Sequence, residues 1–101
     1  MSEDLIALDA VDAVARLKSG DVSASELVEA ALARIEDVNG AVNAVVTTCP
    51  EQAREAAERA DTSTPLAGLP IVVKDLNEVG GVRTTYGSPI FSENVPERDE
   101  V

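Results

Sequence analysis

The run of apolar residues at 66–73, which ends in a lysine and an aspartate, most constrains how this chain can fold. Within it, residues 71–73 are Ile, Val and Val, with no polar residue between them. A strand with one face in water alternates apolar and polar residues, so a continuous run indicates a strand covered on both faces. We therefore expect an interior strand of an α/β sheet, shaped at its entry by Gly68 and Pro70, that ends at Lys74.

The region before this run is predicted to be helical. Apolar positions recur at helical spacing over residues 3–18, and Gly20 is placed to end that helix in a left-handed conformation. Residues 23–26, Ser-Ala-Ser-Glu, match a capping box, and the helix that follows is expected to stop at residues 39–40, Asn-Gly. A third helix, whose exposed face is charged and whose other face is alanine, is predicted over about residues 50–61.

A second strand is predicted at residues 42–48, which are rich in β-branched side chains. Two strands and three helices are too few to cover both faces of a sheet. We therefore expect an α/β fold that is incomplete in this chain. Residues 1–62 would be mainly helical, and residues 66–89 would form a strand and a loop.

The charge of the chain limits its partners. With 19 acidic and 8 basic residues the formal net charge is −11, which argues against nucleic acid and anionic membrane. The bias suits either a high-salt cytoplasm or a GC-rich genome. No basic leader and no apolar run long enough to cross a bilayer is present, so a cytoplasmic protein is expected.

The residue content also narrows the chemistry. Cys49 is the single cysteine and there is no histidine, which rules out an internal disulfide and a Cys–His nucleophile. Residues 80–81, Gly-Gly, have neither the P-loop nor the dinucleotide-binding spacing and are read as a turn. We expect no cofactor and no metal.

Lys74 is the candidate catalytic residue. A lysine at the end of a doubly covered strand holds its ammonium where water is scarce, and desolvation lowers the pKa of a lysine. A lysine with a lowered pKa can serve as a general base at neutral pH. The alternative interpretation is structural: Lys74 emerges at the strand end and pairs with Asp75 or with water.

A wider pattern surrounds Lys74. Residues 65–75 are Pro-Leu-Ala-Gly-Leu-Pro-Ile-Val-Val-Lys-Asp, and residues 81–89 are Gly-Val-Arg-Thr-Thr-Tyr-Gly-Ser-Pro. Together they closely resemble the start of the amidase-signature family, in which a G-[LVI]-P-hydrophobic-K-D strand leads into a T-T-x-G-S loop. The resemblance implies that residues 1–101 are the N-terminal part of an amidase domain with a mixed sheet.

The resemblance also implies a mechanism. Enzymes of this family hydrolyse carboxamide C–N bonds with a lysine, a serine held by a cis peptide bond and a nucleophilic serine, and they need no histidine. Lys74 matches the lysine, which takes a proton through the middle serine so that an acyl-enzyme can form. Neither serine is matched here, because Ser88 belongs to the T-T-x-G-S loop and the Gly/Ser-rich segment is missing. We therefore expect the isolated chain to be inactive.

Seven further residues of the pattern are expected to support the active-site loop rather than to touch substrate. Asp75 either orients Lys74 or hydrogen-bonds the turn that follows, and the second is favoured. The supporting residues are Gly68, Pro70, Asp75, Thr84, Thr85, Gly87 and Ser88.

Two alternatives to a free-standing amidase are left open. The A subunits of glutamyl-tRNA amidotransferases, in the same family, typically carry asparagine after the K-D pair, where this chain has Leu76, and this favours a free-standing amidase. A non-catalytic acidic interaction module is the alternative from another class. The expected partners are a small amide substrate for the complete enzyme, and the rest of the amidase domain or a second copy of the chain.

Overall fold

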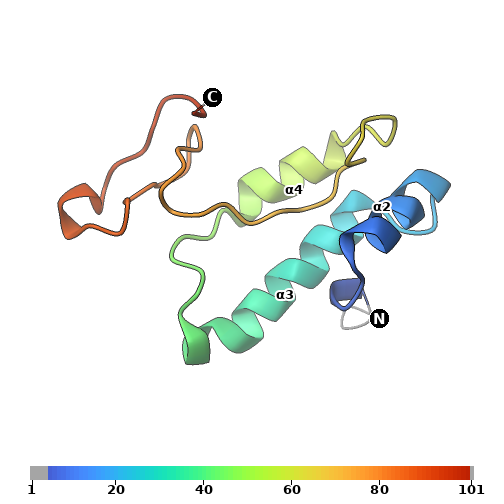
Figure 1. Cartoon of the computed structure of the whole chain (residues 1–101), viewed down its shortest axis with the longest axis horizontal. Coiled ribbons are helices and arrows are strands. Elements are labelled where there is room, and N and C mark those ends of the chain that lie inside the picture. The colour runs from blue at the N-terminus through green and yellow to red at the C-terminus, as the bar shows by residue number, and fades with distance from the viewer. Residues whose placement is uncertain (1–4, 101) are drawn as a thin grey trace. The chain divides into compact units, whose positions relative to one another are not determined.

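The computed structural model describes residues 5–100, which form two compact units. The helical unit comprises residues 5–45 and 50–71, and the loop unit comprises residues 46–49 and 72–100. In chain order the elements are α2 (Ala10–Ser19), α3 (Ala24–Val42), α4 (Pro50–Glu58) and the short 3-10 helix η1 (Pro89–Phe91), as Figure 1 shows. The first three belong to the helical unit, and η1 belongs to the loop unit.

Helix α2 is shorter than the helix predicted over residues 3–18. Asp9 interrupts the expected helix with an extended backbone, and its carboxylate accepts a hydrogen bond from the Asp12 amide at 2.8 Å. Residues 3 and 4 lie outside the described residues. Gly20, with φ of 82°, ends α2 as predicted.

The capping box at the start of α3 is confirmed. The Ser23 hydroxyl accepts from the Glu26 amide, and the Glu26 carboxylate accepts from the Ser23 amide, both at 3.0 Å. The helix runs past the predicted stop at residues 39–40 and ends at Asn43, whose φ is 50°. Asn39 lies within the helix, and its side chain bonds both the amide and the carbonyl of Val45, at 2.8 and 2.9 Å.

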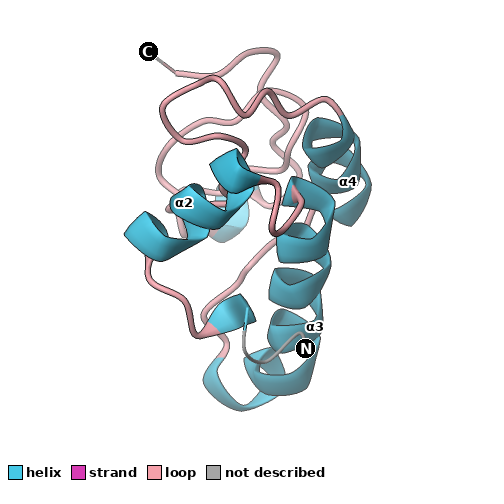
Figure 2. Cartoon of the chain, turned by 90° about the vertical axis from the view of Figure 1, so that its right-hand side faces the viewer, coloured by secondary structure: helices cyan, strands magenta, loops and turns pink. Residues whose placement is uncertain are grey.

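The core of the helical unit lies among its helices. Helix α4 packs beside α3, as Figure 2 shows, and stops at Glu58, short of the predicted residue 61. The Arg54 guanidinium holds the Glu29 carboxylate with two contacts, of 2.7 and 3.2 Å. All buried hydrophobic residues among the described positions belong to this unit: Ala13, Leu17, Val22, Ala24, Leu27, Val28, Ala30 and Ala67.

A left-handed turn closes the helical unit. Ala67 and Gly68 have φ of 56° and 94°, and the Leu69 amide donates to the Leu66 carbonyl at 2.9 Å. A Cβ on Gly68 would lie 2.7 Å from the Ala60 Cβ and 3.1 Å from the Cβ of Ala24. Glycine is therefore required here both by the backbone conformation and by the close approach of Ala60 and Ala24.

The two predicted strands do not form. Within residues 5–100 no strand is present, and both the 42–48 and the 66–73 segments are mainly coil or turn. Ile71 and Val72 are 70% and 81% exposed, so the double covering that the apolar run predicted is not supplied by this chain. A strand needs neighbouring backbone to pair with, and the described residues offer none at this place. The predicted α/β fold is therefore confirmed in part: its helices are present, and its two predicted strands are not formed by the described residues.

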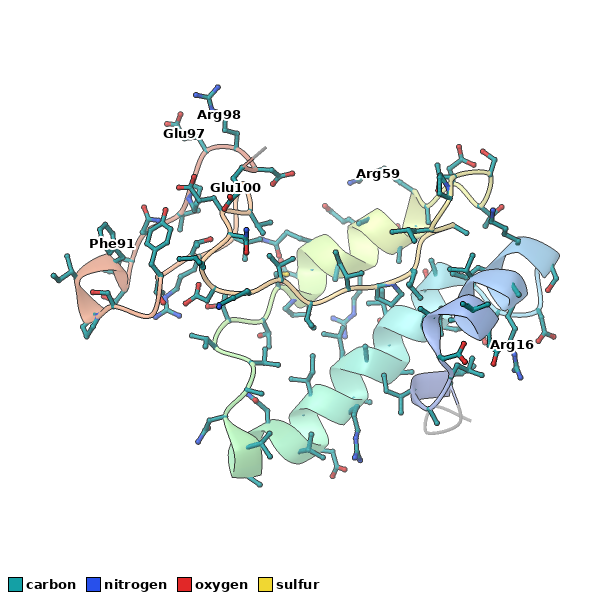
Figure 3. The ribbon with its side chains drawn as sticks, viewed as in Figure 1. Arg16, Arg59, Phe91, Glu97, Arg98 and Glu100 are labelled. Atoms are coloured by element: carbon teal, nitrogen blue, oxygen red, sulfur yellow. The ribbon has the colours of Figure 1, made fainter. Side chains whose placement is uncertain are left out.

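The loop unit is a hairpin-like pair of segments, residues 78–84 and 94–100, joined by backbone hydrogen bonds. The Gly81 amide donates to the Pro96 carbonyl and the Thr84 amide to the Asn94 carbonyl, both at 2.9 Å. A Cβ on Gly80 would lie 2.9 Å from the Arg98 Cα, so only glycine allows the second segment to pass this closely. Figure 3 shows the side chains along this unit, with Arg98 pointing outward.

Candidate functional site

Lys74 begins a turn on the surface of the loop unit. Its carbonyl accepts from the Asn77 amide at 3.0 Å, and the residue as a whole is exposed. Within residues 5–100 its ammonium has no hydrogen bond or ion pair, so neither the apolar surroundings predicted for it nor the alternative pairing with Asp75 is present. Its role as a base stays a prediction.

Asp75 is bound by the T-T-x-G-S loop instead. The Thr85 amide donates to Asp75 Oδ1 at 2.8 Å, and the Thr85 hydroxyl donates to Oδ2 in a short hydrogen bond. Of the two roles proposed for Asp75, the geometry matches the hydrogen bond to a later turn and does not match a direct contact with Lys74.

These contacts change the titration of Asp75. The Thr85 hydroxyl and then the Thr85 amide hold the pKa of the Asp75 carboxyl below its ordinary value, with smaller contributions from the Gly87 amide and the Arg83 charge. Partial burial opposes this effect. The carboxylate is therefore ionised at neutral pH.

The T-T-x-G-S loop is a compact turn. Thr84 and Thr85 are the buried polar residues of the described chain, at 2% and 5% exposure. Tyr86 and Gly87 both have positive φ, 54° and 71°, and the Ser88 amide donates to the Thr85 carbonyl at 2.9 Å. This is the backbone pattern of a type I′ turn, which favours glycine at its second central position.

Ser88 has a structural part in this loop. Its hydroxyl accepts from the Ile90 amide at 3.3 Å and its carbonyl accepts from the Phe91 amide at 3.1 Å, so it caps η1. Thr84 is bonded to the second segment of the hairpin, since the Asn94 side-chain amide donates to the Thr84 carbonyl at 2.9 Å. Both residues thus bond other parts of the loop unit, and their support of an active-site loop stays a prediction.

Three residues near this loop were not identified from the sequence: Tyr86, Phe91 and Arg83. The Tyr86 hydroxyl donates to the Glu78 carboxylate in a short hydrogen bond, which raises the pKa of Tyr86, and its ring meets that of Phe91 edge-on at 5.1 Å. The Arg83 guanidinium donates to the Ser92 carbonyl and, at 2.9 Å, to the Thr47 hydroxyl. Tyr86 and Phe91 are the only aromatic residues of the sequence, and this scarcity was the one signal that could have drawn attention to the pair.

The predicted site residues divide between the units. Gly68 and Pro70 belong to the helical unit, where Gly68 packs on Ala24 and Ala60. The others lie in the loop unit, and the structure brings Asp75, Thr85 and Gly87 into one hydrogen-bonded group. Among the described residues no group of three or more His, Cys, Asp or Glu could hold a metal ion, and no helix is long and apolar enough to span a membrane.

The segment that carries these site residues matches the model of a known protein family. The K-D turn and the T-T-x-G-S loop bound to it lie inside a match to the family model described as Amidase, which covers residues 26–101. The chain belongs to the amidase family.

Curated relatives and a solved structure agree with this assignment. The chain is 43% identical over 90 residues to the A subunit of glutamyl-tRNA(Gln) amidotransferase from Geobacter metallireducens, covering 83% of this chain and 19% of the relative. It is 46% identical over 80 residues to the protein of the same name from Alkalilimnicola ehrlichii, covering 73% of this chain and 16% of the relative. The chain thus spans about a fifth of the length of these relatives.

A solved structure also matches most of this chain but only a part of its own length. This structure, reported under a vestigial protein complex and the evolutionary origins of an s-triazine catabolic enzyme, matches with a TM-score of 0.83 and 35% identity. The match covers 91% of this chain and 22% of that chain. The described fold is therefore that of one section of a larger protein in this relative.

Proposed function

We propose that this chain is the N-terminal section of a cytoplasmic amidase that hydrolyses the C–N bond of a small carboxamide, with Lys74 as its general base. The observation that carries the proposal is the family match over residues 26–101, which includes the K-D pair and the T-T-x-G-S loop. The hydrogen bonds between Asp75 and Thr85 support it, because they join the two parts of the motif into one structure.

In this proposal the Lys74 side chain accepts a proton that is passed from a nucleophilic serine through a second serine. The nucleophile then attacks the amide carbonyl, the amine leaves, and water releases the acyl group. Neither serine is matched in residues 1–101. The chain alone therefore does not hydrolyse amides, and its partner is the rest of an amidase domain, against which the exposed side chains of Ile71 and Val72 would pack.

The test compares the only two lysines of the chain in the full-length protein that carries residues 1–101. Lys74→Ala is expected to lower kcat for a simple carboxamide by about 10²–10⁴-fold, the usual contribution of a general base. Lys18→Ala is the matched control, because Lys18 is an exposed residue near the end of α2, and it should leave kcat unchanged. Activity of Lys74→Ala near that of the wild type would remove Lys74 from the mechanism.

A second candidate function is favoured by the names of the relatives. Several curated proteins at 36–46% identity are A subunits of glutamyl-tRNA(Gln) amidotransferase. Leu76, where those subunits typically carry asparagine, argues for the free-standing amidase. An assay of the purified full-length protein with a simple carboxamide, without other subunits, separates the two. Turnover supports the amidase, whereas turnover that requires the remaining subunits and a charged tRNA supports the amidotransferase.

A further inference from the structure

We propose that Asp75 is a positioning residue for Lys74: by binding the amide and the hydroxyl of Thr85, its carboxylate fixes the backbone that carries the proposed base. The catalytic part of this inference rests on the proposed function. The structural part, that Asp75 holds the turn of Lys74 in place, can be measured without it.

The chain around Lys74 is anchored on one side only. Residues 71–73 are exposed, and they make no backbone hydrogen bond to another described residue. After Lys74 the chain is held at two points: the Lys74 carbonyl accepts from the Asn77 amide at 3.0 Å, and the Asp75 carboxylate is bound by Thr85. Within this unit, the position of Lys74 is therefore set from its C-terminal side.

Of these two points, Asp75 makes the connection across the longer stretch of sequence. The bond from Asn77 closes a turn of neighbouring residues, whereas the bonds from Thr85 reach a loop ten positions away. In the described part of the chain, the Asp75 carboxylate alone joins residues 71–77 to the T-T-x-G-S loop by hydrogen bonds. Asp75 is thus the link between the K-D half and the T-T-x-G-S half of the motif.

The loop provides a buried, hydrogen-bonded anchor for Asp75. Thr85 is 5% exposed, so its hydroxyl and amide would lose their partner with little access to water if the carboxylate were removed. The Thr85 hydroxyl also accepts from the Gly87 amide at 3.3 Å, which connects it to the left-handed turn of Tyr86 and Gly87. Hydrogen bonds to an ionised carboxylate are stronger than neutral ones, and the lowered pKa of Asp75 keeps it ionised.

The same contacts argue against a direct action on the ammonium. Each of the two carboxylate oxygens of Asp75 receives a hydrogen bond from Thr85, and no ion pair with Lys74 is present. Asp75 therefore acts on Lys74 through the peptide backbone. Displacement of a base reduces the rate of proton transfer more than it reduces the binding of substrate, so the effect is expected in kcat.

The experiment uses four variants of the full-length protein. Asp75→Asn and Thr85→Val, which remove one partner each, should lower kcat about 10–100-fold while KM changes by less than about twofold. Thr85→Ser keeps the hydroxyl and should restore most of the rate. Asp61→Asn is the matched control, because Asp61 accepts from the amide and the hydroxyl of Ser63 in a similar way, at 2.9 and 2.6 Å, but belongs to the helical unit.

A second readout does not depend on activity. Residue-resolved amide exchange at Asn77, whose amide donates to the Lys74 carbonyl, should become about tenfold faster or more in Asp75→Asn and Thr85→Val, because the turn opens more often. It should be unchanged in Thr85→Ser and Asp61→Asn. This measures directly whether Asp75 holds the backbone of Lys74.

The results distinguish failure of the positioning role of Asp75 from failure of the proposed function of Lys74. Unchanged Asn77 exchange in Asp75→Asn, or an equal loss of kcat in Asp61→Asn, overturns the positioning role. If Lys74→Ala lowers kcat but Asp75→Asn does not, the proposed function stands and the positioning role is wrong. If Lys74→Ala stays active, the proposed function fails, and Asn77 exchange alone decides whether Asp75 fixes this turn.

Discussion

In the helical unit the side chains withdrawn from water are apolar, whereas in the loop unit they are two threonines. Leu17, 2% exposed, is the largest fully buried side chain of the first, and Thr84 and Thr85 are the buried residues of the second. Many of the large apolar side chains of the loop unit are exposed, with Val72 at 81% and Ile90 at 87% exposure. One unit is therefore held by burial of its own hydrophobic residues, and the other by hydrogen bonds among polar groups.

This difference separates a unit with its own hydrophobic core from a unit whose described residues form none. The lysine that the family pattern singles out lies in the loop unit. The proposed base is therefore carried by the unit that has no hydrophobic core among its described residues.

The largest expected effect tests this contrast directly. Leu17→Ala removes a fully buried side chain and should lower the free energy of unfolding by about 2–5 kcal/mol. Ile90→Ala, the matched truncation in the loop unit, should change it by less than about 0.5 kcal/mol because Ile90 is exposed. Urea denaturation followed by circular dichroism measures both. Equal losses would contradict the division into a core-bearing and a coreless unit.

The next effect tests the packing of the glycine turn in the helical unit. Gly68→Ala and Gly20→Ala both place a side chain at positive φ, which costs about 1–2 kcal/mol. At Gly68 the new Cβ also meets Ala60 and Ala24, and this should cost about 1–3 kcal/mol more, whereas nothing lies within 4 Å at Gly20. Thermal unfolding of the two variants measures the excess. If Gly68→Ala were no worse than Gly20→Ala, the close approach would not contribute to stability.

A smaller effect concerns a hydrogen bond in the unit that is otherwise held by burial. Ser23→Ala removes the acceptor for the Glu26 amide and should cost about 1 kcal/mol. Ser25→Ala is the control, because Ser25 lies inside the first turn of α3 and its side chain does not cap the helix. A loss at Ser23 as large as that of Leu17→Ala would mean that polar contacts dominate this unit as well.

The sequence predicted the helical unit better than the loop unit, for a reason that follows from the same contrast. Helix starts and ends depend on neighbouring residues, and so the Ser23 capping box and the Gly20 stop could be identified directly. The errors at Asp9 and Asn39 arose because one side chain can either cap a helix or lie within it.

The lack of a strand at residues 66–73 in the described structure could not be predicted from the sequence pattern. A continuous apolar run indicates that both faces of the segment are buried in the folded protein. It does not indicate which other segment buries them. The T-T-x-G-S loop was located by resemblance, but its hydrogen bond to Asp75 joins residues ten positions apart and has no local signal. Tyr86 and Arg83 were missed for the same reason, since their partners lie in other segments.

The smallest expected effect is a change in a single titration within the loop unit. The pKa of Asp75 lies below its ordinary value of 3.8, and its largest cause is the Thr85 hydroxyl. Because the folded pKa is depressed, these hydrogen bonds stabilise the protein fully above the unfolded value and are lost as the pH falls through the folded one. Thr85→Val should therefore raise the Asp75 pKa toward 3.8, which carboxyl NMR titration measures.

Thr84→Val is the control for this titration. Thr84 is buried like Thr85, but its hydroxyl donates to the Val82 carbonyl at 3.2 Å and makes no hydrogen bond to Asp75. It should leave the Asp75 pKa where it is. An equal shift in both variants would mean that the loop as a whole, and not the Thr85 hydroxyl, sets the charge of Asp75. The loop unit would then be held by packing after all, and its contrast with the helical unit would be one of degree.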